Sequence, residues 1–66
     1  MTEYEKLLLM RQRCDTMLLS MLGAEQAPGW WKRANKAFAG RTAEEQWQID
    51  PKSVYWYLIG HIDGYW

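Results

Sequence analysis

The chain has 66 residues, and eight lysines and arginines balance eight aspartates and glutamates, so it is neutral and long enough for one small domain. Neutrality argues against a main role in gripping nucleic acid, because that affinity needs a basic face against the phosphates. A single cysteine excludes an intrachain disulfide, and Cys14 and His61 lack the spacing of a metal site. No apolar run reaches the length of a membrane span and the start does not resemble a signal peptide, so we expect a cytoplasmic protein.

Residues 3–22 predict one long helix that ends at Gly23. Its apolar side chains recur at alternating steps of three and four residues, at Leu7, Met10, Cys14, Met17 and Met21. This stripe can fill the core of its own domain, or it can form the seam of a homodimer with the first helices in contact. We predict the homodimer, because chains of this size often gain stability from a partner. We expect Cys14 to be a buried apolar side chain rather than a reactive thiol.

A second helix is predicted from Pro28 to Gly40. Proline suits the first turn of a helix, where its missing N–H costs nothing. Glycine can adopt the left-handed conformation that closes a helix. One face of this helix would carry three apolar residues, Trp31, Ala34 and Phe38. Asn35 is polar within an apolar stretch, and we expect it to tie the turn at Gly40 through hydrogen bonds to the backbone.

Two shorter helices are predicted to follow. Thr42 and Glu45 match a capping box, in which each side chain accepts from the backbone N–H of the other, and Trp47 is the main apolar residue of this third helix. Asp50 and Pro51 start a fourth helix that runs to about residue 62, with Val54, Leu58 and Ile62 on one side. The predicted fold is therefore all-α, a single helical domain over residues 1–66, with one long N-terminal helix and about three shorter ones.

Residues with catalytic chemistry do not form a recognisable arrangement. His61 has no cysteine near it, Asp63 beside it is too common a pairing to indicate a dyad, and no glycine-rich phosphate loop is present. We therefore predict that the chain is not an enzyme and takes no metal or cofactor. A local basic cluster is more simply a solvated helix face than a nucleic-acid contact; its members are Lys32, Arg33, Lys36 and Arg41.

The aromatic residues near the end of the chain exceed what a small core can hide. They are Trp56, Tyr57, Tyr65 and Trp66. Tyrosine and tryptophan often anchor protein interfaces, because they bury a large area and lose few rotamers. The alternative is that Trp66 folds back onto the bundle. A binding surface at this end of the chain is our prediction.

The stretch from residue 29 onward resembles the toxin-binding domain of the Xre/MbcA/ParS antitoxin family. The matching positions are Trp30, Trp31, Asn35, Phe38, Gly40, Thr42, Gln46 and Trp47, followed by Val54, Leu58, Ile62, Gly64 and Tyr65. The sequence departs from the family pattern at Ala34 and Ala43 in place of prolines, Ala39 in place of a glycine and His61 in place of an arginine, and Gly64 stands one residue early. The family usually carries a helix-turn-helix DNA-binding domain before this region, for which the chain has no room.

The resemblance implies a function in which the antitoxin inhibits a RES-domain toxin that consumes NAD. The family's C-terminus enters the active-site cleft of the toxin, and the positions that would do so here, with neighbouring partner contacts, are Trp56, His61, Ile62, Asp63, Gly64, Tyr65 and Trp66. Two other interpretations stay open. One is a stand-alone phage or mobile-element regulator or adaptor that binds another host protein through the same aromatic surface, and the other is a nucleic-acid-binding module that uses the basic cluster.

Overall fold

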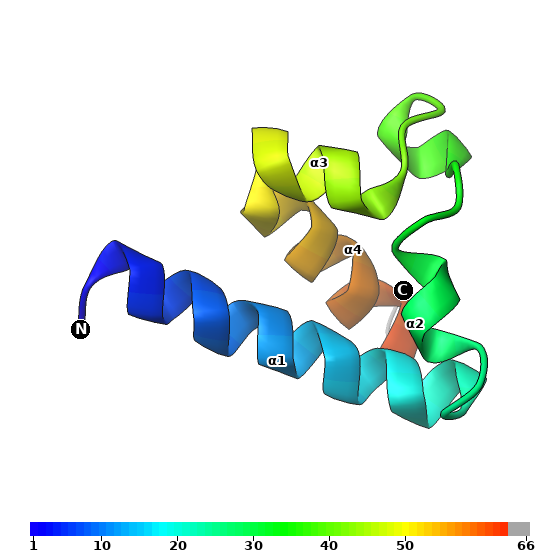
Figure 1. Cartoon of the computed structure of the whole chain (residues 1–66), viewed down its shortest axis with the longest axis horizontal. Coiled ribbons are helices and arrows are strands. Elements are labelled where there is room, and N and C mark those ends of the chain that lie inside the picture. Colours follow the sequence, from blue (N-terminus) through cyan, green and yellow to red (C-terminus); the bar gives the residue numbers. More distant parts are fainter. Residues whose placement is uncertain (64–66) are drawn as a thin grey trace.

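The computed structural model describes residues 1–63, with side chains as far as His61, and it confirms the all-α prediction (Figure 1). The described chain forms a small bundle with one long N-terminal helix and three shorter ones. Its elements are α1 (Glu3–Leu22), α2 (Ala27–Trp30), one turn of 3-10 helix (Lys36–Phe38), α3 (Ala43–Ile49) and α4 (Pro51–Asp63). None of the described helices is both long and apolar enough to cross a membrane.

Helix α1 has the bounds that its sequence predicts, and both of its ends are capped. The Thr2 hydroxyl accepts from the Glu5 N–H at 3.1 Å, and the Glu5 carboxylate accepts from the Thr2 N–H at 3.1 Å. This capping box was not among the sequence predictions. At the other end Gly23 has a φ of 87° and donates its N–H to the Leu19 carbonyl at 2.9 Å, so the predicted stop at Gly23 is confirmed.

The predicted second helix from Pro28 to Gly40 is wrong. Helix α2 ends at Trp30, and the chain then turns and forms an isolated antiparallel bridge between Ala34 and Thr42. The reason is Asn35, whose backbone is extended and whose side-chain oxygen accepts from the Ala37 N–H at 2.9 Å. A short polar side chain that bonds its own neighbouring backbone competes with helix formation.

Helices α3 and α4 follow the sequence predictions closely. Thr42 and Glu45 form the expected capping box, with distances of 3.1 Å from the Glu45 N–H to the Thr42 hydroxyl and 2.8 Å from the Thr42 N–H to the Glu45 carboxylate. Helix α4 begins at Pro51, and its first turn is tied back by the Ser53 hydroxyl, which donates to the Asp50 carbonyl at 2.7 Å. Two helices are thus joined through Asp50 alone.

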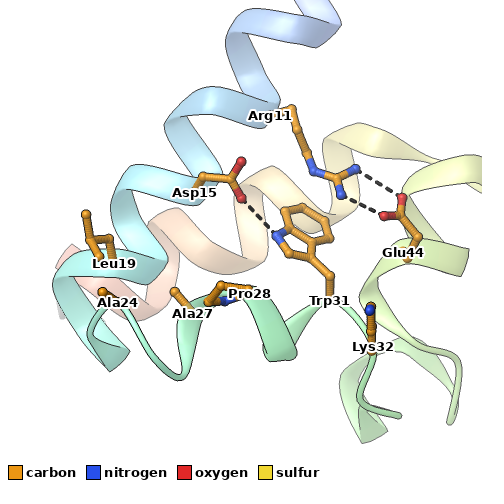
Figure 2. Close-up of a pocket in the computed structure, with 9 residues that line it drawn as sticks. All are labelled: Arg11, Asp15, Leu19, Ala24, Ala27, Pro28, Trp31, Lys32 and Glu44. Carbon is orange, nitrogen blue, oxygen red and sulfur yellow. Dashed lines mark hydrogen bonds and ion pairs between the residues drawn. The ribbon is translucent and has the colours of Figure 1, made fainter.

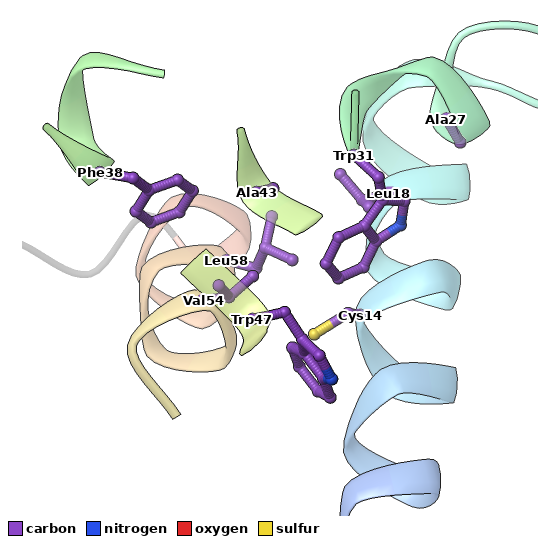
Figure 3. Close-up of a cluster of buried hydrophobic side chains, with 9 residues drawn as sticks. All are labelled: Cys14, Leu18, Ala27, Trp31, Phe38, Ala43, Trp47, Val54 and Leu58. Carbon is purple, nitrogen blue, oxygen red and sulfur yellow. The ribbon is translucent and has the colours of Figure 1, made fainter. Parts of the chain in front are cut away.

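The hydrophobic core lies where α1, α3 and α4 meet. Helix α1 packs on α4, α4 packs on α3, and α2 folds back onto α1 (Figure 1). Figure 3 shows the buried side chains, which are Cys14, Leu18, Ala27, Trp31, Phe38, Ala43, Trp47, Val54 and Leu58. Every described helix contributes at least one of them, so no helix of the bundle is an appendage.

Most of the apolar stripe of α1 packs against the core of the same chain. Cys14 is fully buried, and Leu7, Met10 and Met17 are partly buried against the core cluster, whereas Met21 is exposed. Most of the predicted seam of a homodimer therefore packs against the core of its own chain. The homodimer stays a prediction, and it needs a different surface of α1.

Candidate functional site

The tryptophans of the 29–48 stretch form an edge-to-face network inside the molecule. The ring of Trp31 meets Trp30 at a centroid distance of 5.2 Å and Trp47 at 5.8 Å, with interplanar angles of 81° and 89°. Trp30 in turn stacks on Tyr57 of α4 at 6.4 Å, and Phe38 meets the same tyrosine edge-on at 5.1 Å. Such pairs add stabilisation beyond the burial of area. We therefore assign these aromatic contacts to the stability of the fold and not to ligand binding.

The turn between residues 35 and 41 is built on Asn35, as expected. Its carbonyl accepts from the Gly40 N–H at 3.0 Å, and its N–H donates to the Arg41 carbonyl at 2.9 Å. Gly40 has a φ of 83°, the left-handed region that glycine adopts without strain. Ala39 also has a positive φ, of 57°. The turn brings Phe38 into the core beside α4.

A charged clamp from α1 and α3 surrounds the ring of Trp31 (Figure 2). The guanidinium carbon of Arg11 lies 3.6 Å from the centroid of the Trp31 ring, a cation–π geometry. Arg11 also makes a bidentate pair with Glu44, with nitrogen-to-oxygen distances of 2.7 and 3.0 Å. From the other side, the indole N–H of Trp31 donates to the carboxylate of Asp15 at 2.9 Å. The buried indole thus has its polar atom satisfied.

Sequence analysis missed this clamp. Arg11 and Glu44 lie 33 positions apart, so no local pattern connects them. The one available signal was the placement of Arg11 and Asp15 four residues apart, on the flank of an apolar stripe. That signal indicates a helix flank near other polar groups, but it does not identify Glu44 as the residue that pairs with Arg11.

The clamp borders an open groove between α1, α2 and α3, with a volume of about 560 Å³ (Figure 2). Its apolar wall is formed by Leu19, Ala24, Ala27 and Pro28, and its polar edge by Arg11, Asp15, Lys32 and Glu44. The hydrogen bond and the charge of Arg11 hold the pKa of the Glu44 carboxyl below its usual value. Glu44 is therefore a fixed anion at neutral pH and offers no proton to a reaction.

Cys14 does not offer a nucleophile either. Its side chain is fully buried, and burial raises the pKa of its thiol to about 11, because desolvation disfavours the thiolate. The interpretation of Cys14 as a small apolar side chain is confirmed. In the described part of the chain, no group of three or more His, Cys, Asp and Glu side chains could hold a metal ion.

The predicted partner-binding residues are placed only in part by the structure. Trp56 lies on the outward side of α4 with 63% of its surface exposed, and its ring meets Tyr55 edge-on at 5.8 Å. His61 is exposed, and its ring contacts Tyr57 at 4.2 Å. Ile62 and Asp63 belong to α4, but their side chains lie outside the described residues. Gly64, Tyr65 and Trp66 lie outside them altogether.

The basic cluster does not form a helix face, which corrects the sequence interpretation. Lys32 and Arg33 follow α2 in a turn, Lys36 starts the 3-10 turn, and Arg41 precedes α3. Arg33 donates to the Gln26 side chain at 2.8 Å, and Arg41 donates to the Phe38 carbonyl at 3.4 Å. Two of the four cations thus make contacts within the chain.

The site consequently has two surfaces with binding chemistry, the groove beside Trp31 and the outward face of α4. Among the residues that the structure describes, neither surface brings together a nucleophile, a general base and a place for a reacting atom. The sequence matches no protein-family model, and comparisons with curated proteins and with solved structures find no relative.

Proposed function

We propose that the chain is a non-enzymatic protein-binding domain whose partner contacts the outward face of α4. The observation that carries this proposal is the exposure of Trp56, because the other tryptophans among the described residues all pack in or against the core. Ile59 and Gly60, which are three and four residues further along α4, share this side of the helix and are partly exposed. Because Gly60 has no side chain, the surface beside the Trp56 ring is open, and a partner side chain can pack there.

In its specific form, the proposal is that the domain acts as an antitoxin-like inhibitor of a RES-type toxin that consumes NAD. Its support is the sequence resemblance together with the geometry of the turn. The backbone at Ala39 and Gly40 has positive φ at both positions, where the family pattern carries two glycines. Helix α4 would present Trp56 and His61 to the toxin, and residues 62–66 would enter its active-site cleft.

The test is a pair of substitutions of equally exposed apolar residues on different helices. Trp56 and Ile49 are each 63% exposed, the first on α4 and the second at the end of α3. We expect Trp56→Ala to weaken binding to the toxin encoded beside this gene by about thirtyfold to several hundredfold, since an anchoring tryptophan contributes about 2 to 4 kcal/mol. Ile49→Ala should leave the affinity unchanged. Titration calorimetry measures both.

Equal affinities for the two variants would contradict the proposed surface. Tight wild-type binding to a protein that is not a RES-type toxin would favour the alternative function, a stand-alone regulator or adaptor of another host protein. The same exposed Trp56 supports that alternative, so the identity of the adjacent gene product separates the two. A mobility shift at low salt would test the nucleic-acid interpretation, and we expect no shift.

A further inference from the structure

Helix α1 carries a second stripe, on the flank of the one that fills the core. It consists of Tyr4, Leu8, Arg11, Asp15, Leu19 and Leu22, which we call the flank stripe. Successive members stand three or four residues apart, so they share one side of the helix. Three of its four apolar members are unusually open for a small domain, with 70% of Tyr4, 44% of Leu8 and 51% of Leu19 exposed, whereas Leu22 is partly buried against the core.

The flank stripe borders two hollows that follow one another along α1. The groove beside Trp31 reaches Arg11, Asp15 and Leu19. A smaller pocket of about 220 Å³ begins at Arg11 and continues toward the start of the helix, past Leu8 to Tyr4. Arg11 lines both, so its side chain lies where the two hollows adjoin. Two hollows that follow one another beside a helix can together receive the side chains of another helix.

We propose that the flank stripe and its two hollows receive α1 of a second copy of the chain, packed antiparallel. The charges of the flank stripe select this occupant and this direction. In a parallel pair Arg11 would face Arg11 and Asp15 would face Asp15, whereas in an antiparallel pair each Arg11 faces the Asp15 of the other copy. Opposite charges at the centre of a helix pair fix its register and exclude the reversed arrangement.

The apolar residues fit the same register. Placing Arg11 opposite Asp15 of the second copy puts Leu8 opposite its Leu19 and Tyr4 opposite its Leu22, to within one residue. In a two-fold symmetric interface every such contact occurs twice. The pairing thus buries the exposed Tyr4, Leu8 and Leu19 of both copies around a charged centre.

The clamp leaves both charged groups able to make this contact. Arg11 uses one N–H on each terminal nitrogen for Glu44, and a guanidinium has five N–H donors in all. Asp15 accepts from Trp31 through one oxygen, Oδ1, which leaves the other available. The self-contact uses α1, whereas the proposed partner contact uses Trp56 on α4, so either can hold without the other.

A charge swap tests the direction of packing as well as the contact. We expect wild-type protein to sediment at twice its monomer mass of 7.9 kDa at high micromolar concentration. Leu8→Glu alone and Leu19→Lys alone should each weaken the dimer by about tenfold or more, because each places one charge against a leucine. The double variant Leu8→Glu/Leu19→Lys should return to within a few-fold of wild type, because each new glutamate then faces a new lysine.

The control is Trp56→Ala, which should remain as dimeric as the wild type. Circular dichroism melting of all variants separates dissociation from unfolding, and Leu8 and Leu19 are not core residues. A monomeric wild type would overturn the proposal. So would single variants that dimerise normally, or a double variant that stays dissociated while folded, since the last result means that Leu8 does not face Leu19.

Discussion

At the scale of single residues, the most consequential arrangement is the set of polar groups that hold Trp31 in the core. A buried indole N–H without a partner costs stability, and Asp15 removes that cost by accepting its hydrogen bond. Arg11 covers the ring face and is itself fixed by Glu44. Because the pair with Glu44 is bidentate, the planar guanidinium is held in one orientation over the ring. Charged residues therefore position the aromatic core here.

The pair between Arg11 and Glu44 predicts an acid-dependent part of the stability. Arg11 lowers the pKa of Glu44 in the folded chain, so the pair contributes stability above the unfolded-state pKa and loses it as the pH falls through the folded-state pKa. We expect Glu44→Gln to lower the free energy of unfolding at pH 7 by about 0.5 to 1 kcal/mol, a value limited by solvent screening of this half-exposed pair. The variant and wild type should converge in acid, once the pH lies below the lowered folded-state pKa of Glu44.

Thermal melting at pH 7 and in acid measures this difference. The matched control is Glu3→Gln, because Glu3 forms a 3.7 Å pair with Lys6 on the exposed start of α1. We expect that substitution to change the melting temperature little at either pH. A Glu44→Gln deficit that persists unchanged in acid would mean that the carboxylate acts through packing rather than through its charge.

At the scale of elements, the helices that the sequence predicts well are those whose ends carry their own signals. Helix α1 ends at Gly23, and α3 begins at the Thr42 capping box, as expected. The second helix fails because the spacing of Trp31 and Phe38 imitates a helical face. Both side chains are buried, but a turn around Asn35 rather than a helix carries Phe38 to the core.

The candidate site was less predictable than the fold, and the reason lies in sequence distance. Trp56 could be proposed as exposed because a core of this size cannot hide every aromatic residue, and it is exposed. The groove could not be proposed, because it needs Glu44 beside Arg11 and both beside Trp31. Contacts between residues so far apart follow from how the helices pack, and no short motif encodes them.

The turn that replaces the second helix leads to a prediction about Ala39. This residue has a φ of 57°, in the left-handed region where a side chain is strained. We expect Ala39→Gly to stabilise the domain by about 0.5 to 1 kcal/mol, which would raise the melting temperature of so small a domain by several degrees. The strain relieved in the folded chain must exceed the extra freedom that glycine has in the unfolded chain.

The neighbouring position supplies the opposite substitution as a control. Gly40 has a φ of 83°, and an added Cβ there would meet no atom within 4 Å, so Gly40→Ala tests backbone strain alone. It should lower the melting temperature. If Ala39→Gly also lowered it, the freedom of the unfolded chain would outweigh the strain at Ala39.

At the scale of the whole molecule, the chain uses its aromatic residues for two purposes. Trp31 contacts Trp47 of α3 and Trp30 stacks on Tyr57 of α4, so these rings join three segments of the chain into one core. Trp56 is left on the surface, where burial by a partner would be favourable. This division places the proposed partner contact on α4 and the proposed self-contact on α1. A domain built this way can lose a binding residue without losing its fold.

That separation predicts the effect of removing the last two residues, Tyr65 and Trp66. Helix α4 ends at Asp63, and the buried side chains that the structure describes lie between Cys14 and Leu58. If residues 62–66 enter the cleft of a toxin, the truncated chain should lose inhibition, with affinity reduced by about tens- to hundredsfold for one lost tryptophan anchor. Its melting temperature should stay within a few degrees of wild type.

The alternative, in which Trp66 packs on the bundle, predicts a different effect of the truncation on the melting temperature. If Trp66 instead packs on the bundle, the truncation removes core contacts, and each 1 kcal/mol lost lowers the melting temperature by about 4 to 8 °C. Melting and toxin inhibition are therefore measured on the same truncated protein, beside a chain with Trp66→Phe alone. Phenylalanine keeps an aromatic ring for packing but lacks the indole N–H. A toxin cleft that binds through this N–H should therefore be inhibited more weakly by the Trp66→Phe chain than by wild type. Full inhibition by the truncated chain would show that the C-terminus does not enter the cleft, and would leave Trp56 to carry the contact.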